Sequence, residues 1–268
     1  MFLEYLKYII YGLIQGFTEF IPVSSTAHLK VISLFIGIDD PGPSLSAIIQ
    51  LGSVLALIYY FKNDFFKLKR YFLQKNFDFL INKRLLCSIL IGTLPIFLLG
   101  VTIKLFVPYF FDKFLRSNLS IALVSLLMAV FMFIADRSKR GSLKLTNHRF
   151  SDSFFIGLSQ AFAIVPGVSR SGITISTALL SGWERGDAAK LSFLLGIPAI
   201  SLASIVEFIS SFNEFNSFNF IHLIIGLTTT FVSSLFAIDF LLKYLSSNGL
   251  KLFIIYRVVF GVVILLNL

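Results

Sequence analysis

Six long apolar runs constrain the fold of this chain more than any other feature of its sequence. They cover residues 45–61, 85–107, 119–135, 191–209, 220–242 and 252–268. A bilayer core of roughly 30 Å needs about 20 apolar residues in a helical span, whereas a membrane β-strand shows an alternation over about ten. A hydrophobic content of 56% over 268 residues is also too high for an ordinary soluble domain. The sequence therefore predicts an all-α integral membrane protein, with six transmembrane helices in one domain over residues 1–268.

Lysine and arginine are concentrated in two loops, which indicates how the chain is oriented. Residues 62–84 hold seven basic and two acidic side chains, and residues 136–149 hold five and one. Residues 210–219 hold no basic side chain. Because basic residues accumulate in cytoplasmic loops, the first two loops are predicted to be cytoplasmic and the third to face outward. The net charge of +9 is then an orientation signal and does not predict a nucleic-acid partner.

Two further apolar regions, residues 2–38 and 152–182, are each interrupted midway by proline and hydroxyl residues. Short arms such as residues 29–36 would have to cross a core about twice their length. If every arm crossed, the basic loops would also change sides. Each region is therefore predicted to form a re-entrant helical hairpin, with a plain first span through residues 3–21 as the alternative.

The two interrupted regions contain an internal repeat. The pattern Gly-Leu-x-Gln-x-Phe at residues 12–17, followed by Val23-Ser24, recurs at residues 157–162, followed by Val168-Ser169 at the same spacing. One hairpin plus three spans is an odd number of crossings, so the second half enters the membrane from the opposite face. The sequence thus predicts an inverted-topology repeat over about 1–135 and 152–268, unless the match arose by chance. The first hairpin would open outward and the second inward.

Polar side chains gather at the break in the first hairpin. Gln15 and Glu19 are four residues apart and share one face of the entering helix. Pro22 ends that helix, and the return arm begins with the capping residues Ser24, Ser25 and Thr26. His28 stands three residues beyond Ser25, on the same predicted side.

The second hairpin repeats this arrangement with a positive charge. Pro166-Gly167 forms the break, Ser169 is the predicted cap, and Arg170 and Thr174 lie on one face of the helix that follows. Two helix N-termini would then meet in one polar pocket. Free amides, the positive end of a helix dipole and a guanidinium together suit a phosphate or diphosphate.

The charges in this pocket predict a metal cofactor. Glu19 would repel a diphosphate unless a divalent cation lay between them, and Mg²⁺ commonly binds one or two carboxylates together with substrate phosphate oxygens. Glu19 is the predicted ligand, with Gln15 as a neutral helper, and Ca²⁺ is the alternative ion. A structural ion pair between Glu19 and Arg170 is the other interpretation of these two residues.

The sequence leaves the nucleophile open. Ser25 with His28 as its base is one arrangement, because a serine hydroxyl attacks phosphorus only when a neighbour removes its proton. A water molecule activated by the metal or by His28 is the other.

The motifs resemble those of the bacterial undecaprenyl-diphosphate phosphatase family, also called the bacitracin-resistance family. The resemblance runs along the whole chain and rests on Gln15-x-x-x-Glu19, Pro22-Val23-Ser24-Ser25-Thr26-Ala27-His28, Gln50-Leu51-Gly52-Ser53, Pro166-Gly167-Val168-Ser169-Arg170-Ser171-Gly172-x-Thr174, Ser192-Phe193-Leu194-Leu195 and Tyr256-Arg257. This chain departs from the family pattern in four places. Gln15 replaces a first acidic residue, and Ala27 replaces a common glycine. Ser46 stands where some relatives carry a glutamate, and Lys190 where some carry an acidic residue.

The resemblance implies an enzyme of the bacterial inner membrane, with its site open to the periplasm. It implies removal of the terminal phosphate from undecaprenyl diphosphate, which recycles the carrier for peptidoglycan and confers bacitracin resistance. It also implies a divalent cation and a homodimer. The implied roles are metal binding by Glu19 and Gln15, catalysis by Glu19, Ser25, His28 and Arg170, and substrate binding by Ser24, Thr26, Ser169, Ser171 and Thr174. A polyprenyl-phosphate or anion transporter is the alternative function, because inverted repeats with broken helices also occur in transporters.

Overall fold

The computed structural model describes residues 2–64, 78–106, 111–139, 141–210 and 218–268. Helices dominate this part of the chain, and its one isolated β-bridge joins Leu143 to Trp183. The helices are α1 (Phe2–Phe20), α2 (Ser25–Ile36), α3 (Gly42–Tyr60), α5 (Asp78–Phe106), α7 (Asn118–Asp136), α8 (Phe150–Gln160), α9 (Arg170–Leu180), α10 (Arg185–Ser210), α12 (Phe220–Ser247) and α13 (Lys251–Leu266). Two short elements complete the order, the π-helix η1 (Phe111–Leu115) and the 3-10 helix η2 (Ala161–Ile164).

Five of the described helices are long and apolar enough to cross a membrane. These are α3, the stretch Arg84–Ile103 of α5, α7, the stretch Arg185–Ile209 of α10, and α12. They coincide with five of the six predicted apolar runs, and the sixth forms α13, which has 16 residues. The prediction of an all-α, multi-pass membrane protein is confirmed. Most of the predicted loops at 62–84 and 210–219 lies outside the described residues.

Both interrupted regions form two helices separated by a break. Helix α1 ends at Phe20 and α2 begins at Ser25, while η2 ends at Ile164 and α9 begins at Arg170. Within the described chain, only Ser24 (φ 79°) and Ser169 (φ 70°) are non-glycine residues with positive φ. This conformation costs about 1–3 kcal/mol per residue and persists where the surroundings impose it. The two serines are the residues that the predicted repeat aligns.

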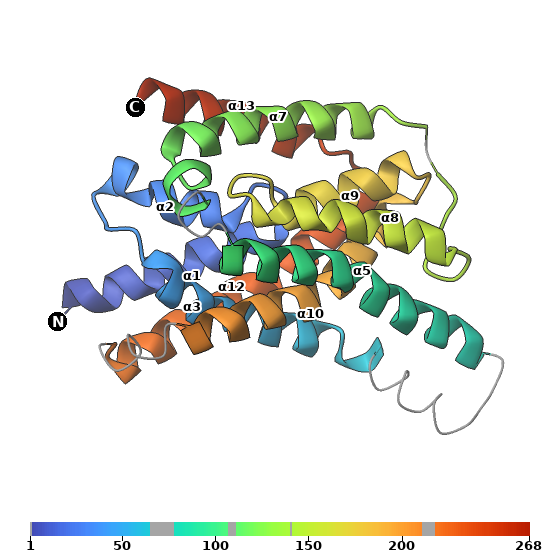
Figure 1. Cartoon of the computed structure of the whole chain (residues 1–268), viewed down its shortest axis with the longest axis horizontal. Helices are drawn as coiled ribbons and strands as arrows, with labels where there is room; N and C mark the ends of the chain where they lie inside the picture. The colour runs from blue at the N-terminus through green and yellow to red at the C-terminus, as the bar shows by residue number, and fades with distance from the viewer. Residues whose placement is uncertain (1, 65–77, 107–110, 140, 211–217) are drawn as a thin grey trace.

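The helix pairs contact one another in a regular pattern (Figure 1). Helices α7 and α13 lie side by side along one edge of the molecule, and α8 lies beside α5. Helices α1 and α3 both pack on α12, and α3 also packs on α10. The breaks of the two hairpins therefore lie inside a frame of long helices.

Glycines allow two of these contacts to be unusually close. A Cβ atom on Gly12 of α1 would lie 2.6 Å from the carbonyl oxygen of Gly226 in α12, and one on Gly52 of α3 would lie 2.5 Å from that of Leu227. Small residues at helix crossings let backbones approach, which is how membrane helices associate without a hydrophobic driving force. Helix α12 is thus held between α1 and α3 by backbone contact.

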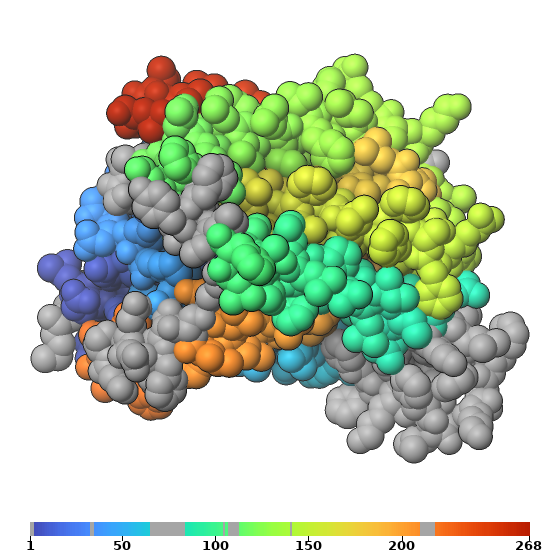
Figure 2. Space-filling model, in the orientation of Figure 1, coloured from blue at the N-terminus to red at the C-terminus, as the bar shows by residue number. Residues whose placement is uncertain are grey.

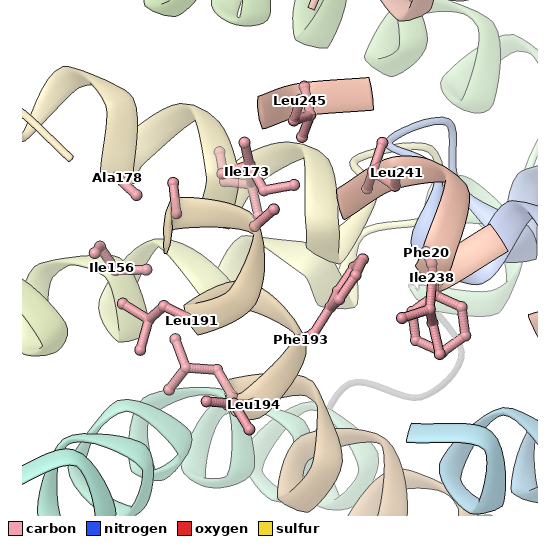
Figure 3. Close-up of a cluster of buried hydrophobic side chains, with 14 of the residues drawn as sticks. Phe20, Ile156, Ile173, Ala178, Leu191, Phe193, Leu194, Ile238, Leu241 and Leu245 are labelled. Atoms are coloured by element: carbon pink, nitrogen blue, oxygen red, sulfur yellow. The ribbon is translucent and has the colours of Figure 1, made fainter. Parts of the chain in front are cut away.

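The main buried cluster contains residues from both hairpins and from the long helices beside them (Figure 3). Phe20 at the end of α1 meets Phe193 of α10 edge-on, with ring centroids 5.3 Å apart. Ile238 and Leu241 of α12 and Ile173 of α9 belong to the same cluster. Because Phe20 follows Glu19 and Phe193 follows Ser192, the cluster anchors the backbone next to the polar residues described below.

The outer surface of α5 and α8 is apolar, as lipid contact requires. The space-filling view shows these two helices side by side on one face (Figure 2). Leu90, Leu94 and Leu98 of α5 follow one another at four-residue intervals and are each more than half exposed. Phe155 and Leu158 of α8 are exposed beside them. This surface would be unfavourable in water and suits the hydrocarbon core of a bilayer.

Candidate active site

Glu19 lies in the last turn of α1, next to the first break. Its Oε2 atom accepts hydrogen bonds from the Gln15 amide at 2.9 Å, the Ser25 hydroxyl at 2.7 Å and the Gln50 amide at 3.3 Å. The side chain is only 5% exposed. The predicted shared face of Gln15 and Glu19 is confirmed. Gln50, which the sequence analysis did not assign to the site, comes from α3.

The second break places a guanidinium opposite this carboxylate. Arg170 is the first residue of α9, and its Nη1 atom donates to the main-chain oxygen of Ser192 at 2.8 Å. Its Nη2 atom lies 3.8 Å from Oε1 of Glu19, and its side chain is 8% exposed. Neither Nε nor Nη2 has a hydrogen-bond acceptor. These two atoms form one edge of the guanidinium, the edge that binds oxyanions in a bidentate manner.

The remaining hydroxyl residues of the second break support the start of α9. Ser169 caps the helix by accepting the Gly172 amide at 3.2 Å, as predicted, and its hydroxyl lies 3.3 Å from that of Ser171. Thr174 donates to the carbonyl oxygen of Arg170 at 2.8 Å, and its hydroxyl lies 2.7 Å from that of Ser192. Ser171 and Thr174 are fully buried. Neither residue lines the cavity described below, and their predicted substrate contacts stay a prediction.

The two breaks contact each other directly. The main-chain amide of Gly167 donates to the Ser24 hydroxyl at 3.2 Å. Together with the pair formed by Arg170 and Glu19, this bond joins the two hairpins across the centre of the molecule. The predicted meeting of the two polar breaks is present in the structure.

A cavity of about 360 Å³ opens between the breaks. Its polar lining consists of Thr18, Glu19, Ser24, Ser25, Thr26, Gln50, Thr93, Ser169, Arg170 and Glu207. Its apolar lining comes chiefly from α5 and α10, and includes Ile96, Phe97, Val101, Leu202, Ala203 and Val206. The cavity can therefore accept a molecule with an anionic head and an apolar chain.

The structure places the ring of His28 beside α13, and the catalytic role predicted for this residue stays a prediction. Its Nδ1 atom lies 2.7 Å from the carbonyl oxygen of Ser24, and its Nε2 atom lies 2.6 Å from the Tyr256 hydroxyl. The ring stacks on Phe260 of α13 and does not line the cavity. Because the Ser24 carbonyl only accepts, Nδ1 carries the proton and Nε2 accepts from Tyr256. Both nitrogens are thus occupied away from Ser25, whose hydroxyl donates to Glu19 instead.

Gly196 leaves room for the guanidinium of Arg170, which leads to a prediction. A Cβ atom at this position of α10 would lie 2.5 Å from Nη1 of Arg170 and 2.7 Å from its Cζ. Gly196→Ala should therefore displace the guanidinium, and a shift of about 1 Å at a reacting centre can lower turnover about 10²-fold. Gly186→Ala is the matched control, because it is in the same helix and a Cβ there meets nothing within 4 Å. Equal kcat values for the two variants would contradict the prediction.

Comparison with known proteins places the chain in a family. The family model described as bacitracin resistance protein BacA matches residues 8–263. A protein named undecaprenyl-diphosphatase from Prochlorococcus marinus strain MIT 9312 is 77% identical over the full length of both chains. Another of that name, from strain NATL2A, is 46% identical over 98% of this chain and 95% of its own. This chain belongs to the BacA family of bacitracin resistance proteins.

Proposed function

We propose that this protein hydrolyses undecaprenyl diphosphate to undecaprenyl phosphate and inorganic phosphate. The main supporting observation is the edge of the Arg170 guanidinium that has no hydrogen-bond acceptor, buried at the cavity that Glu19 and Ser25 also line. A buried donor pair without an acceptor is costly, and a phosphate group would satisfy both donors at once. The relatives are named undecaprenyl-diphosphatase, which agrees with undecaprenyl diphosphate as the substrate. The product would be the lipid carrier on which bacterial wall synthesis depends, and the family is described as bacitracin resistance proteins.

The bond between Ser25 and Glu19 supports a proton transfer at this site. The Ser25 hydroxyl donates to Oε2 of Glu19 at 2.7 Å, which is within range for general-base catalysis. Oγ of Ser25 attacks the terminal phosphorus while its proton passes to Glu19. The bond from that phosphorus to the bridging oxygen breaks, and undecaprenyl phosphate leaves. Water then hydrolyses the phosphoserine, and direct attack by a water molecule at Glu19 is the alternative route.

The donors around Glu19 fit a hard divalent cation that the substrate helps to bind. The described residues contain no group of three or more histidine, cysteine, aspartate or glutamate side chains that could hold a metal unaided. Mg²⁺ is commonly bound by one or two carboxylates with substrate phosphate oxygens, and Ca²⁺ also takes oxygen ligands. Glu19 would supply the carboxylate, and Gln15 would assist as a neutral ligand. When bound, the cation would offset the repulsion between Glu19 and the diphosphate.

The apolar lining of the cavity supports a prenyl chain as the remainder of the substrate. Phe97 and Val101 of α5 and Leu202 and Val206 of α10 lie on the same cavity as Arg170. Burial of apolar surface contributes about 25 cal/mol per Å², so a chain held between these helices adds affinity without a directional contact. Thr26, also on the cavity and exposed, is a candidate contact for the lipid phosphate with Ser24 and Ser169.

We also propose that the chain crosses the membrane six times and has two re-entrant hairpins in an inverted repeat. Under this repeat α1 corresponds to α8 and α5 to α12. The packing of α1 on α12 and of α8 on α5 are then equivalent contacts, which supports the proposal. The positive φ that Ser24 and Ser169 share supports it as well. In the bacterial inner membrane, the first hairpin would open the site to the periplasm. The homodimer remains a prediction.

Phosphate release by the purified protein tests this function. In detergent, undecaprenyl diphosphate should yield one inorganic phosphate per lipid monophosphate. EDTA should abolish the reaction and added Mg²⁺ or Ca²⁺ should restore it, because Glu19 faces the diphosphate in the cavity. A transporter is the competing function, and proteoliposomes distinguish it. Movement of a labelled polyprenyl phosphate between leaflets, with no phosphate release above the level of Arg170→Ala protein, would overturn the proposal.

A further inference from the structure

A second buried arginine contacts both breaks at once. Arg257 of α13 is fully buried and donates from Nη1 to the carbonyl oxygen of Pro22 at 3.1 Å. Its Nη2 atom donates to the carbonyl oxygen of Gly167, and its Nε atom to that of Ser125 in α7 at 3.4 Å. None of the ion pairs in the described part of the chain includes Arg257. Its three contacts are all with main-chain oxygens.

The carbonyls of Pro22 and Gly167 are equivalent positions of the two breaks. Each precedes a strained serine by two residues, Ser24 in one break and Ser169 in the other. At such breaks the helical hydrogen bonds stop, and a carbonyl without a partner inside a membrane is costly. One guanidinium satisfies both carbonyls through different nitrogens. The distance between the two breaks is thereby coupled to the fixed geometry of a single planar group.

We infer that Arg257 is a positioning residue that sets the separation between Ser25 with Glu19 on one break and Arg170 on the other. Ser25 lies three residues after Pro22, and Arg170 lies three residues after Gly167. The backbone of Arg257 is itself held by α7. The Ser125 hydroxyl donates to the Arg257 carbonyl oxygen at 3.2 Å, and α7 packs along α13. The inference rests on the proposed function only for its kinetic readout.

The inference predicts a loss of turnover even in a variant that keeps the positive charge of Arg257. Arg257→Lys keeps a positive charge but presents its donors from one nitrogen atom, whereas the two carbonyls are bound by separate nitrogens. Both Arg257→Lys and Arg257→Gln should lower kcat of the folded protein about 10²-fold, the effect expected of a misplacement of about 1 Å. Arg185→Gln is the matched control. Arg185 is a partly buried arginine that, like Arg257, donates to a main-chain carbonyl, here that of Asp136, and it does not line the cavity.

Distance measurement between the hairpins tests the inference without reference to activity. Nitroxide labels at Thr26→Cys and Phe162→Cys, in a Cys87→Ser background, report the separation of the two breaks, since both positions are exposed. Pulsed electron spin resonance should give a broader or shifted distance distribution for Arg257→Lys and Arg257→Gln, and an unchanged one for Arg185→Gln.

Each result either supports or overturns the inference. Unchanged distances in Arg257→Lys, or wild-type kcat in that variant, would mean that Arg257 does not position the breaks. Arg185→Gln is expected to lower thermal stability and leave kcat unchanged. The same result for the Arg257 variants would mean that Arg257 contributes only to folding. If Arg257→Gln does not fold, Arg257→Lys carries the test alone. Altered distances in the Arg257 variants, with no phosphate release by the wild-type protein, would refute the proposed function and leave the positioning role intact.

Discussion

Arg170→Ala should lower phosphate release from undecaprenyl diphosphate about 10³-fold, within the range measured when an anion-stabilising donor or arginine is removed from other enzymes. The physical reason is that Nε and Nη2 of Arg170 are buried in the cavity without acceptors. Their interaction with the phosphoryl oxygens strengthens as negative charge develops there. The measurement is kcat and kcat/KM by phosphate release, normalised to the folded fraction. Arg170→Lys should fall between the wild type and the alanine variant, because it keeps the charge and loses the bidentate edge.

The matched control for this experiment is Arg185→Ala. Arg185 pairs with Asp136 at 2.8 Å and is part-buried like many structural arginines, but it lies away from the cavity. Removing Arg170 leaves Glu19 with its three hydrogen-bond donors, so the carboxylate is not left unsatisfied. The fold should therefore survive Arg170→Ala. A variant that loses folded protein but keeps wild-type activity per folded molecule would show that Arg170 is structural.

Glu19→Gln should also abolish most activity, with a loss of about 10²–10⁴-fold if Glu19 acts as a general base. The amide cannot take the Ser25 proton and is a far weaker cation ligand. Phosphate release at increasing Mg²⁺ concentration separates these two effects. A loss that saturating Mg²⁺ repairs would indicate metal binding alone, and a loss that persists would indicate the missing base. Ser25→Ala should be impaired to a similar degree. Near-normal activity of Ser25→Ala would mean that water, and not Ser25, attacks the phosphorus.

Asp239→Asn is the control for the carboxylate variant. Asp239 is also an acid within an apolar helix, where it accepts from Tyr60 at 3.2 Å and from Lys243 at 2.7 Å. It does not line the cavity between the breaks. Its neutralisation should leave turnover unchanged. An equal loss in Asp239→Asn and Glu19→Gln would mean that any intramembrane charge change disables the protein, and the assigned role of Glu19 would not stand.

Local features of the sequence predicted the parts of the site that local structure determines. The four-residue spacing of Gln15 and Glu19 and the capping role of Ser169 are properties of single helices, and both appear as expected. The contacts of His28 could not be predicted in the same way, because helical spacing gives a shared side but not the neighbouring helix that this side meets. Ser25 is the first residue of α2 and reaches back to α1, while His28 faces α13.

Residues that reach the site from distant helices belong to motifs of the family resemblance, but nothing in their local sequence assigned them to the site. Gln50 of α3 and Ser192 of α10 contact Glu19 and Arg170 only because their helices pack beside the breaks. Arg257 lies 235 positions after Pro22, whose carbonyl oxygen it binds. A polar side chain in an apolar run does suggest a partner, but the partner is set by tertiary packing. Such contacts become visible only when the helices are placed in space.

The origin of the two charged groups limits how small a working version of this protein can be. Glu19 and Ser25 belong to the first hairpin and Arg170 to the second, and Ile164 occupies the place in the second hairpin that Glu19 has in the first. A fragment ending before α8 would carry the acid without its cationic counterpart, and the complementary fragment would carry the reverse. Neither fragment could assemble a functional centre by itself. Two separately expressed halves would regain one only by docking with each other.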